Sequence, residues 1–361
     1  MSTKPHVFAV AQLPPPVTGL SAVNARIIQE LEATGLLFAK VDLAPPRGWP
    51  LALKPAGRLA KAVSAVLRLA VARASGARTL YMPCDGGAGL VLNVFLAAAA
   101  RVLGYSSWTH HHSFAYLNRR SSLMAAFLRF SPKGTTHLLL CDRMESLLLE
   151  RYPSEWPANN AKAIVLSNAF MADAANATPT TDGALVLGHL SNLTEDKGAL
   201  RFLDLFARLR RQGVAVQAKI AGPVHEPKVK AAIEATNAEF PDAFRWLGPV
   251  YGPDKDAFYE GVDVFVFPSS YANEAQPLVL LEALARGAAI ITTDRGCMGC
   301  DHEGSPGAVF PEADFDTSAQ HWIEELAANF DRVQLSQDAK KRFVGLKREA
   351  DQALAAVLRA I

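Results

Sequence analysis

The chain has 361 residues, which exceeds one ordinary domain and leads us to expect two. Half of the residues are apolar and a fifth are charged, which is normal for a soluble globular enzyme. The longest apolar stretch, residues 88–100, is interrupted by Asn93 and is too short to span a bilayer.

The net charge of +2 hides an asymmetry along the chain. Residues 1–170 hold 18 Lys and Arg against 8 Asp and Glu, a balance of +10, so the remainder carries −8. A basic first half favours attraction to an anionic surface, such as a membrane leaflet or a phosphate-bearing acceptor. Uneven surface charge explains the same numbers equally well.

The beginning of the sequence does not resemble a signal peptide. Residues 1–6 are polar, and the first apolar run, residues 7–10, is too short for the apolar region of such a peptide. Cysteine usage leads us to expect a reducing, cytoplasmic location. Peripheral contact with the inner face of the cytoplasmic membrane is an option that the basic half leaves open. No nucleic-acid partner is expected.

The first half alternates predicted strands and helices. A strand over residues 7–13 ends in three prolines and leads through Gly19 to a helix over about 22–33. A Gly-containing loop at this place lets the backbone approach a phosphate, although the Gly-x-Gly-x-x-Gly fingerprint of dinucleotide binding is missing. The other predicted strands cover 79–83, 106–110, 136–141 and 163–166. The other predicted helices are one over 57–74, an Ala-rich one that ends before Gly104, and one over 144–152.

Three consecutive histidines, His110, His111 and His112, begin at the last residue of the strand over 106–110. The carboxyl end of a strand is where open α/β sheets bind ligands. Strand geometry predicts that His110 and His112 point to one face and His111 to the other. An accident of packing is the alternative, and no metal is expected because neither a His-Glu-x-x-His motif nor a carboxylate partner lies nearby.

Residues 57–74 and 118–134 are basic amphipathic segments. In the first, apolar side chains such as Leu59, Val63 and Leu67 share one face, and the arginines lie largely elsewhere. Such a helix can lie on an anionic membrane. A core helix with a cationic solvent face explains the pattern equally well.

Small polar residues with Pro and Gly over 172–183 predict a domain boundary. The alternation then restarts, and two successive βαβ arrays predict two doubly wound domains with a cleft between them. The predicted strands cover 185–189, 216–220, 244–247, 262–267 and 288–293, and the predicted helices cover 199–212, 229–238, 255–261, 278–286, 322–330 and 338–361.

Two carboxylates lie in the block over residues 263–293. Glu274 is in the loop after a buried strand, and Glu282 lies eight residues later in an otherwise apolar helix. A carboxylate at such a strand end is an acceptor for sugar or ribose hydroxyls. The alternatives are an ordinary residue at the positive end of a helix for Glu274, and a half-buried Glu paired with an Arg for Glu282.

The stretch Cys297-Met298-Gly299-Cys300 has the spacing of a metal or redox pair. It lacks a second such pair, and His302 is not placed for haem attachment. A Gly-rich active-site loop is the favoured interpretation, and neither a metal nor a cofactor is expected.

These features, taken in order, resemble family 4 retaining glycosyltransferases ("glycosyl transferases group 1"), which have the GT-B fold. The pair Glu274 and Glu282 resembles the signature of that family. Ser191-Asn192-Leu193 with Lys197-Gly198 resembles its phosphate loop. The further resemblances are the N-terminal Gly loop at 15–20, the His-Ser pair at 112–113, and the strand ends at 219–222 and 246–248.

The resemblance implies two Rossmann-like domains that face a central cleft. Residues 1–172 would bind the acceptor, residues 173–340 would bind the nucleotide sugar, and residues 341–361 would form a helix that packs back towards the first domain. It implies transfer of a hexose-type sugar, without an obligatory metal, from a nucleotide-diphosphate sugar to a lipid-linked, polysaccharide or small-molecule acceptor.

The resemblance also implies roles for particular residues. His112, Lys197 and Glu274 would be catalytic, with His110 and His111 as rivals of His112. Lys197 would contact the diphosphate, Glu274 would hold the sugar, and Glu282 would hold the ribose. The other substrate-binding residues would be Gly19, Asn192, Gly222, Val250, Ala275, Gln276, Pro277 and Leu278.

One departure concerns the phosphate loop, where Asn192 replaces the usual Arg. Lys197 would then carry more of the charge, helped by His189 or Arg295. The replacement favours one alternative, a non-catalytic GT-B-like protein that binds carbohydrate or a partner. A nucleotide-sugar epimerase on the same scaffold is the other alternative.

Overall fold

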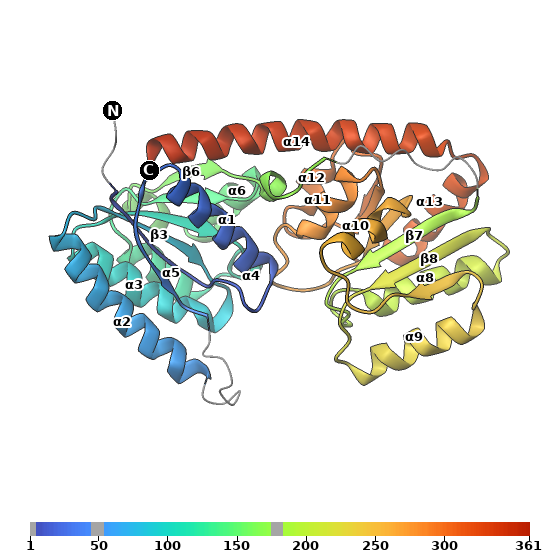
Figure 1. Cartoon of the computed structure of the whole chain (residues 1–361), viewed down its shortest axis with the longest axis horizontal. Coiled ribbons are helices and arrows are strands. Elements are labelled where there is room, and N and C mark those ends of the chain that lie inside the picture. The colour runs from blue at the N-terminus through green and yellow to red at the C-terminus, as the bar shows by residue number, and fades with distance from the viewer. Residues whose placement is uncertain (1–4, 45–53, 175–182) are drawn as a thin grey trace. The chain divides into compact units, whose positions relative to one another are not determined.

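The computed structural model describes residues 5–44, 54–174 and 183–361. Contacts divide the chain into two compact units, each of which is described by itself (Figure 1). Unit 1 comprises residues 1–171 together with 350–361, and unit 2 comprises residues 172–349. The long helix α14 (Arg332–Ala360) therefore begins in unit 2 and ends in unit 1.

Unit 1 is built on a six-stranded parallel sheet with the strand order β2-β1-β3-β4-β5-β6. The central strands β1 and β3 are buried along their whole length, as expected of parallel strands that are covered on both faces. The strands are β1 (Val7–Ala11), β2 (Leu37–Asp42), β3 (Thr79–Cys84), β4 (Ser106–His111), β5 (Thr136–Leu139) and β6 (Lys162–Val165).

The helices of unit 1 follow its strands. Helix α2 contacts α3, α3 contacts α5, and these three lie together on one side of the sheet (Figure 1). No helix in the described ranges is both long and apolar enough to cross a membrane. The helices are α1 (Gly19–Ala33), α2 (Lys54–Ala74), α3 (Leu90–Val102), α4 (Ala115–Asn118), α5 (Ser122–Phe130), α6 (Asp142–Arg151) and α7 (Glu155–Ala158).

Unit 2 is also built on six parallel strands, in the order β12-β11-β10-β7-β8-β9. One core cluster of this unit includes Leu187, Phe202, Phe206 and Val264, and it fills the space between the sheet and its helices. The strands are β7 (Leu185–Leu190), β8 (Val216–Ala221), β9 (Phe244–Trp246), β10 (Val264–Phe267), β11 (Ala289–Thr293) and β12 (Gly307–Phe310). The helices are α8 (Ala199–Arg211), α9 (Pro227–Glu239), α10 (Pro253–Glu260), α11 (Leu278–Ala285), α12 (Met298–His302) and α13 (Phe315–Ala328).

The strand order places a topological switch point in each sheet. In unit 2 the chain turns in opposite directions after β7 and after β10, which are neighbours, and in unit 1 this happens at β1 and β3. Ligands of doubly wound sheets bind outside the carboxyl ends of the strands at such a point. The loops that leave β7 and β10 therefore mark the first place to look for a site in unit 2.

The doubly wound alternation predicted from the sequence is confirmed in both units. Two strands were not predicted, β2 and β12, and both lie at a sheet edge. The expected loop around Cys300 contains the short helix α12. The last two helices begin earlier than predicted, α13 at Phe315 and α14 at Arg332.

Candidate functional site

The loop between β7 and α8 is held against the loop that follows β10. Gly198 has a φ of +86°, and a Cβ at this position would lie 2.5 Å from the carbonyl oxygen of Pro268. The amide of Ser270 donates to the carbonyl of Asp196 at 2.8 Å. This close backbone approach brings Lys197 to the loop that carries Glu274.

Lys197 and Glu274 form the ion pair at the centre of this region. Nζ of Lys197 lies 2.6 Å from Oε2 of Glu274, and the side chains are 22% and 8% exposed. The same oxygen accepts from the hydroxyl of Ser269 at 3.2 Å, and the Lys197 ammonium lies 4.3 Å from the centre of the Tyr271 ring. No described residue donates to Oε1 of Glu274, so this oxygen is available to a ligand hydroxyl.

Glu282 is held by two residues of the neighbouring helix α10. Lys255 donates to Oε1 at 2.6 Å, and the hydroxyl of Tyr259 donates to Oε2 at 2.8 Å. The pairing residue is therefore a lysine, where the sequence suggested an arginine as the alternative to a ligand. A carboxylate offers about four lone-pair positions, so Glu282 retains acceptor capacity beyond these two bonds.

The segment from Ala275 to Leu278 is braced by the loop that follows β11. The carbonyl of Ala275 accepts from the amide of Cys297 at 2.7 Å, and Gly296 packs so closely that a Cβ would lie 2.4 Å from this oxygen. Pro277 precedes α11, which begins at Leu278, so the amides of the first turn point towards the loop.

Gln276 is buried and donates through Nε2 to both carboxylate oxygens of Asp301, each at 2.9 Å. Burial raises the pKa of Asp301 to about 7, although Gln276 and Arg342 oppose this rise. The stretch predicted as a Gly-rich loop thus supplies a buried carboxyl that fixes the orientation of Gln276.

Asn192 is exposed, and no hydrogen bond of its side chain is found among the described residues. The suggestion that His189 adds positive charge to that of Lys197 is wrong. Burial lowers the pKa of His189 to about 4, so its ring is neutral at pH 7 and brings no charge. Its ring nitrogens instead lie within hydrogen-bonding distance of the Val266 carbonyl and the Ser191 hydroxyl. Arg295 forms an ion pair with Glu312.

Gly222 and Val250 lie beyond the carboxyl ends of β8 and β9. Gly222 has a φ of +132°, and a Cβ there would lie 1.8 Å from the carbonyl oxygen of Ser191. Only glycine fits this approach between the two loops. Val250 is half-buried in the loop that follows β9.

In unit 1, Gly19 is the exposed first residue of α1. It follows the cap formed by Thr18, whose hydroxyl accepts from the amide of Ser21. Its φ is not positive, so glycine is not required here by the backbone conformation. What it contributes is a backbone without a side chain at the start of the helix.

The three histidines divide between the faces of β4 as the alternation predicts. The rings of His110 and His112 lie 4.1 Å apart, and His110 lies 3.1 Å from the Tyr81 hydroxyl. His111 points elsewhere and lies 2.8 Å from both the Tyr116 hydroxyl and His137.

Burial lowers the pKa of His112 to about 3, so its imidazole is neutral at pH 7. Its Nε2 is buried and has no hydrogen-bond partner among the described residues. Among those residues, no group of three or more acidic, His or Cys side chains is placed to hold a metal ion.

Unit 2 thus brings Lys197 and Glu274 into contact, whereas Glu282 contacts neither of them through a direct bond. Five side chains that complete these environments were not predicted from the sequence. Ser269 and Tyr271 lie within residues 263–293 but carry no charge, and Lys255 and Tyr259 show only a helical spacing of four. The fifth, Asp301, follows the Cys297–Cys300 pair directly, and the spacing of the cysteines was considered in its place.

Comparison with known proteins places unit 2 among sugar-transferring enzymes. Residues 184–329 match the family described as "Glycosyl transferases group 1", which confirms the resemblance to that group for most of unit 2. No curated protein matches the chain in sequence.

Solved structures match the whole chain. HepE from Anabaena, solved with UDP, is 14% identical with a TM-score of 0.64 over 97% of this chain and 100% of that one. Sucrose-phosphate synthase from Thermosynechococcus elongatus is 16% identical with a TM-score of 0.72 over 99% and 100%. The lipopolysaccharide outer core galactosyltransferase WaaB, in its apo form, is 14% identical with a TM-score of 0.65 over 97% and 99%. The chain therefore has the GT-B fold.

Proposed function

We propose that the protein is a retaining glycosyltransferase that moves a hexose-type sugar from a nucleoside-diphosphate sugar to a lipid-linked, polysaccharide or small-molecule acceptor. The observation that carries the proposal is the pair of Lys197 and Glu274 at the switch point of a unit that matches glycosyl transferases group 1. HepE has been solved with UDP, with UDP and glucose, and with UDP-glucose, which supports a donor of this class.

The donor is proposed to bind to the loops of unit 2. Lys197 neutralises the diphosphate, and Oε1 of Glu274 accepts from a hydroxyl of the transferred sugar. Glu282 accepts from the ribose hydroxyls with its remaining lone pairs. The base lies near Gly222 and Val250, and the backbone from Ala275 to Leu278 lies near the phosphates, with the side chain of Gln276 held away by Asp301.

The proposed reaction breaks the bond between the anomeric carbon and the phosphate oxygen. The acceptor oxygen forms its bond on the same face of the sugar, and its proton passes to the departing phosphate oxygen. Lys197 stabilises the charge that develops on this phosphate. The N-termini of α8 and α11 add positive potential, so we assign no metal to this step. Glu274 is given no nucleophilic role.

We propose that unit 1 binds the acceptor, with Gly19 at its edge. His112 is the proposed catalytic residue of this unit. As a neutral imidazole with an unpartnered Nε2 it can exchange a hydrogen bond with a sugar hydroxyl without bringing charge. His110 and His111 are fully buried and lie within hydrogen-bonding distance of Tyr81 and Tyr116, whereas His112 is half-buried, which makes it better suited to this role. We further propose a cytoplasmic location.

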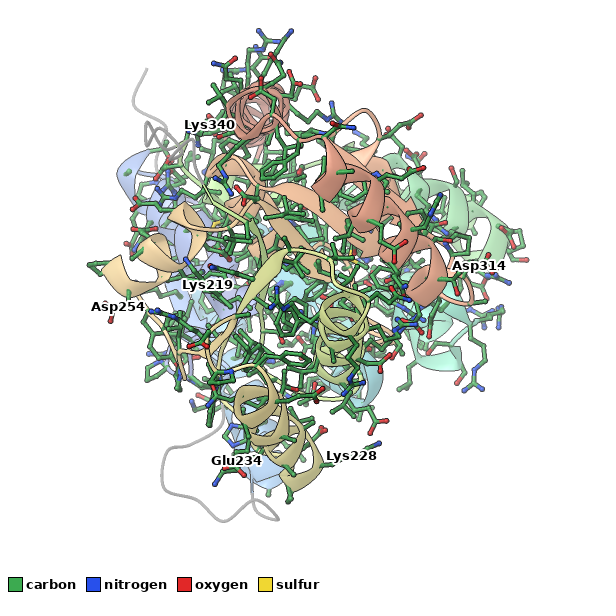
Figure 2. The ribbon with its side chains drawn as sticks, turned by 90° about the vertical axis from the view of Figure 1, so that its right-hand side faces the viewer. Lys219, Lys228, Glu234, Asp254, Asp314 and Lys340 are labelled. Atoms are coloured by element: carbon green, nitrogen blue, oxygen red, sulfur yellow. The ribbon has the colours of Figure 1, made fainter. Side chains whose placement is uncertain are left out.

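The first experiment compares Lys197→Ala and Glu274→Gln with Lys228→Ala, measuring binding and transfer from UDP-, GDP- and ADP-sugars. Lys228 forms an ion pair of similar length with Glu195, but on the exposed side of α9 (Figure 2). We expect Lys197→Ala to lower kcat by about 10²–10³, because it removes positive charge from the departing phosphate. Lys228→Ala should leave kcat and donor binding unchanged.

The alternatives give different results. A protein that only binds carbohydrate would show no turnover of any donor, and an epimerase would release an isomerised nucleotide sugar without an acceptor. Analysis of the product by NMR reads the anomeric configuration. If no nucleotide sugar binds in calorimetry, or if the product is inverted, the proposal is wrong.

A further inference from the structure

Helix α2 packs on unit 1 through its small residues. Among its buried positions are Ala62, Ala65 and Ala72, with Leu69 as the large exception. The larger apolar side chains form a stripe on the solvent side and are 45–69% exposed; they are Leu59, Val63, Leu67 and Val71. Their spacing of four places them along one line of the helix. The apolar face expected from the sequence is therefore not used for the core.

Helices α2, α3 and α5, which contact one another in sequence along this side, carry no acidic residue. Helices α2, α3 and α5 comprise 21, 13 and 9 residues and contain no Asp or Glu, although these make up about a tenth of the chain. The exposed large apolar side chains continue onto the two neighbouring helices, at Val91, Phe95 and Val102 of α3 and at Phe130 of α5. A surface that is both apolar and free of carboxylates suits an anionic lipid leaflet.

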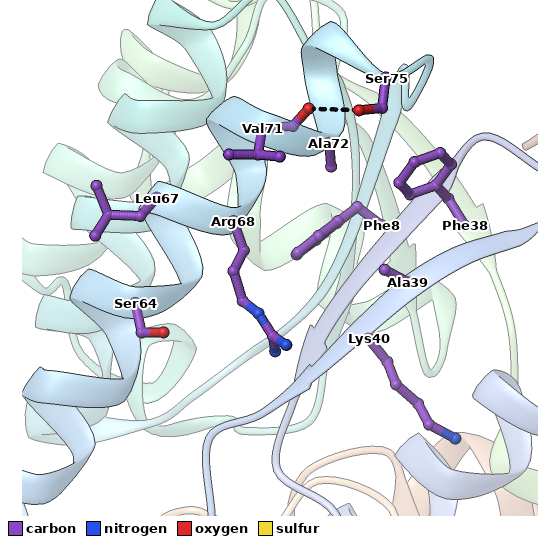
Figure 3. Close-up of a pocket in the computed structure, with 10 residues that line it drawn as sticks. All are labelled: Phe8, Phe38, Ala39, Lys40, Ser64, Leu67, Arg68, Val71, Ala72 and Ser75. Atoms are coloured by element: carbon purple, nitrogen blue, oxygen red, sulfur yellow. Dashed lines mark hydrogen bonds between the residues drawn. The ribbon is translucent and has the colours of Figure 1, made fainter.

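A pocket of about 360 Å³ opens beside the stripe, between α2 and the edge strand β2 (Figure 3). Its volume is within the range of small-molecule sites. The aromatic rings of Phe8 and Phe38 lie towards one end in this view, and the charged ends of Arg68 and Lys40 lie towards the other. Leu67 and Val71 belong both to the pocket lining and to the exposed stripe, so the two features are continuous.

The two cations of the pocket differ in their partners. Lys40 forms an ion pair with Glu32 at 2.6 Å. Within the described ranges, Arg68 has neither an ion pair nor a side-chain hydrogen bond, and it is exposed. A guanidinium presents several donors in a geometry that matches a phosphate. The pocket thus combines an apolar wall with one unpaired phosphate-binding group.

We propose that this pocket binds one acyl chain of an anionic membrane phospholipid, with its headgroup phosphate on Arg68. A glycan would leave its hydroxyls without partners on walls made of Phe8, Phe38 and Val71. A lipid instead matches the apolar end with its chain and the cationic end with its phosphate. The stripe on α2 inserts into the same leaflet and contacts the chains of neighbouring lipids beside the pocket. This inference does not depend on the transfer reaction.

Binding of one chain is expected to be weak. A single acyl chain gives an association constant of about 10⁴ M⁻¹ with a bilayer, and stable attachment needs a second contribution. The exposed stripe and the cations supply it. Because the cations are exposed, the attachment should weaken as salt is added.

The first test uses soluble probes in calorimetry, below their micelle concentrations. Dodecyl phosphate offers chain and anion, inorganic phosphate offers the anion alone, and a neutral amine-oxide detergent with the same chain offers the chain alone. We expect dodecyl phosphate to bind with about 10³–10⁴ M⁻¹, the neutral detergent more weakly, and inorganic phosphate undetectably.

The second test uses variants and vesicles of phosphatidylcholine with or without phosphatidylglycerol. Ser64→Trp fills the pocket from an exposed position of its lining, and Ala60→Trp adds the same ring on α2 outside the lining. We expect Ser64→Trp and Arg68→Glu to weaken binding of both dodecyl phosphate and phosphatidylglycerol vesicles by about tenfold or more, whereas Ala60→Trp binds like the parent protein. Arg68→Lys keeps the charge but not the forked donors, so its binding should lie between that of Arg68→Glu and that of the parent.

Each result decides the proposal. If Ser64→Trp binds the probe and the vesicles like the parent, no acyl chain enters the pocket, and the protein only adsorbs to the surface of the vesicle. If neutral vesicles bind as well as anionic ones, the role of Arg68 is wrong. If Ser64→Trp has a lower unfolding temperature, Arg68→Glu at its exposed position decides the question. Nucleotide-sugar binding in unit 2 should be unchanged in all variants, so this test fails or succeeds separately from the proposed transfer.

Discussion

Six histidines, five of them buried and His112 half-buried, are neutral rings at pH 7, which makes the stability of the protein depend on pH. Burial lowers the pKa of His112, His137 and His302 to about 3 and that of His189 to about 4. The pKa values of His110 and His111 also lie well below the usual 6.5. The unfolded chain therefore binds more protons than the folded chain between about pH 3 and pH 6.5.

The free energy of unfolding should accordingly fall as the pH is lowered through 6.5. Each of the four histidines with a pKa of about 3 or 4 lowers it by about 2 kcal/mol at pH 5, relative to pH 7.5, and His110 and His111 act in the same direction. Asp301 acts in the opposite direction, because its raised pKa of about 7 lets the folded protein keep a proton, but it is one group against six. Urea unfolding at several pH values measures the slope. A profile that is flat between pH 7 and pH 5 would contradict the buried neutral rings.

Single residues show how far the site could be predicted. The position of Glu274 after a strand was enough to predict that its carboxylate lies at the carboxyl edge of the sheet, because parallel strands share that edge. The partners of Glu282 were not predictable in the same way. Lys255 and Tyr259 lie on another helix, and local spacing does not encode which helices pack side by side. The neutrality of His189 likewise depends on burial, which its immediate neighbours in sequence do not determine.

At the scale of elements, two glycines allow the loop contact at the site to be tested. Gly198 and Gly213 have similar φ values, +86° and +83°. A Cβ on Gly198 would meet the Pro268 carbonyl at 2.5 Å, whereas a Cβ on Gly213 would meet nothing within 4 Å. The two positions share the backbone strain and differ in the contact.

Gly213→Ala should therefore cost only the left-handed conformation, about 1 kcal/mol, and should leave donor binding unchanged. Gly198→Ala should cost about 2–4 kcal/mol, because the two loops must move apart, and it should weaken nucleotide-sugar binding as well. Urea midpoints and calorimetry measure the two effects. Equal losses in both variants would show that the loops of β7 and β10 are not held together by this contact.

Elements at the edge of a sheet were the hardest to predict. The central strands of both units are almost completely buried and were predicted, whereas β2 is largely half-buried or exposed and β12 is only half-buried. An edge strand lacks a neighbour on one side, so its sequence carries less apolar signal. Helix α2 shows the related limit. Its periodicity predicted a helix correctly, but the alanine face packs on the sheet, because burial is decided by the space available and not by hydrophobicity alone.

At the scale of the whole molecule, α14 is fixed at both ends in different ways. Its first residue, Arg332, belongs to unit 2 and donates to Asp263 at 2.7 and 3.0 Å, with both side chains buried. Its last residues belong to unit 1, where Leu354 and Val357 are buried and the carbonyl of Ile361 lies 3.0 Å from Nε2 of His6. The helix is therefore part of the core of each unit in turn.

This arrangement predicts that a defect near the end of α14 destabilises unit 1 alone. Leu354→Asp places a carboxylate at a buried position, and we expect it to cost about 3 kcal/mol or more. Ala356→Asp adds the same group at an exposed position two residues later and should stay within about 0.5 kcal/mol of the parent.

Hydrogen exchange followed by mass spectrometry reads each unit separately. In Leu354→Asp, β1 and β3 should exchange faster while β7 and β10 keep their protection, because the lost contacts belong to unit 1. Equal loss of protection in both sheets would mean that the units unfold as one, and the assignment of residues 350–361 to an independent unit 1 would be wrong.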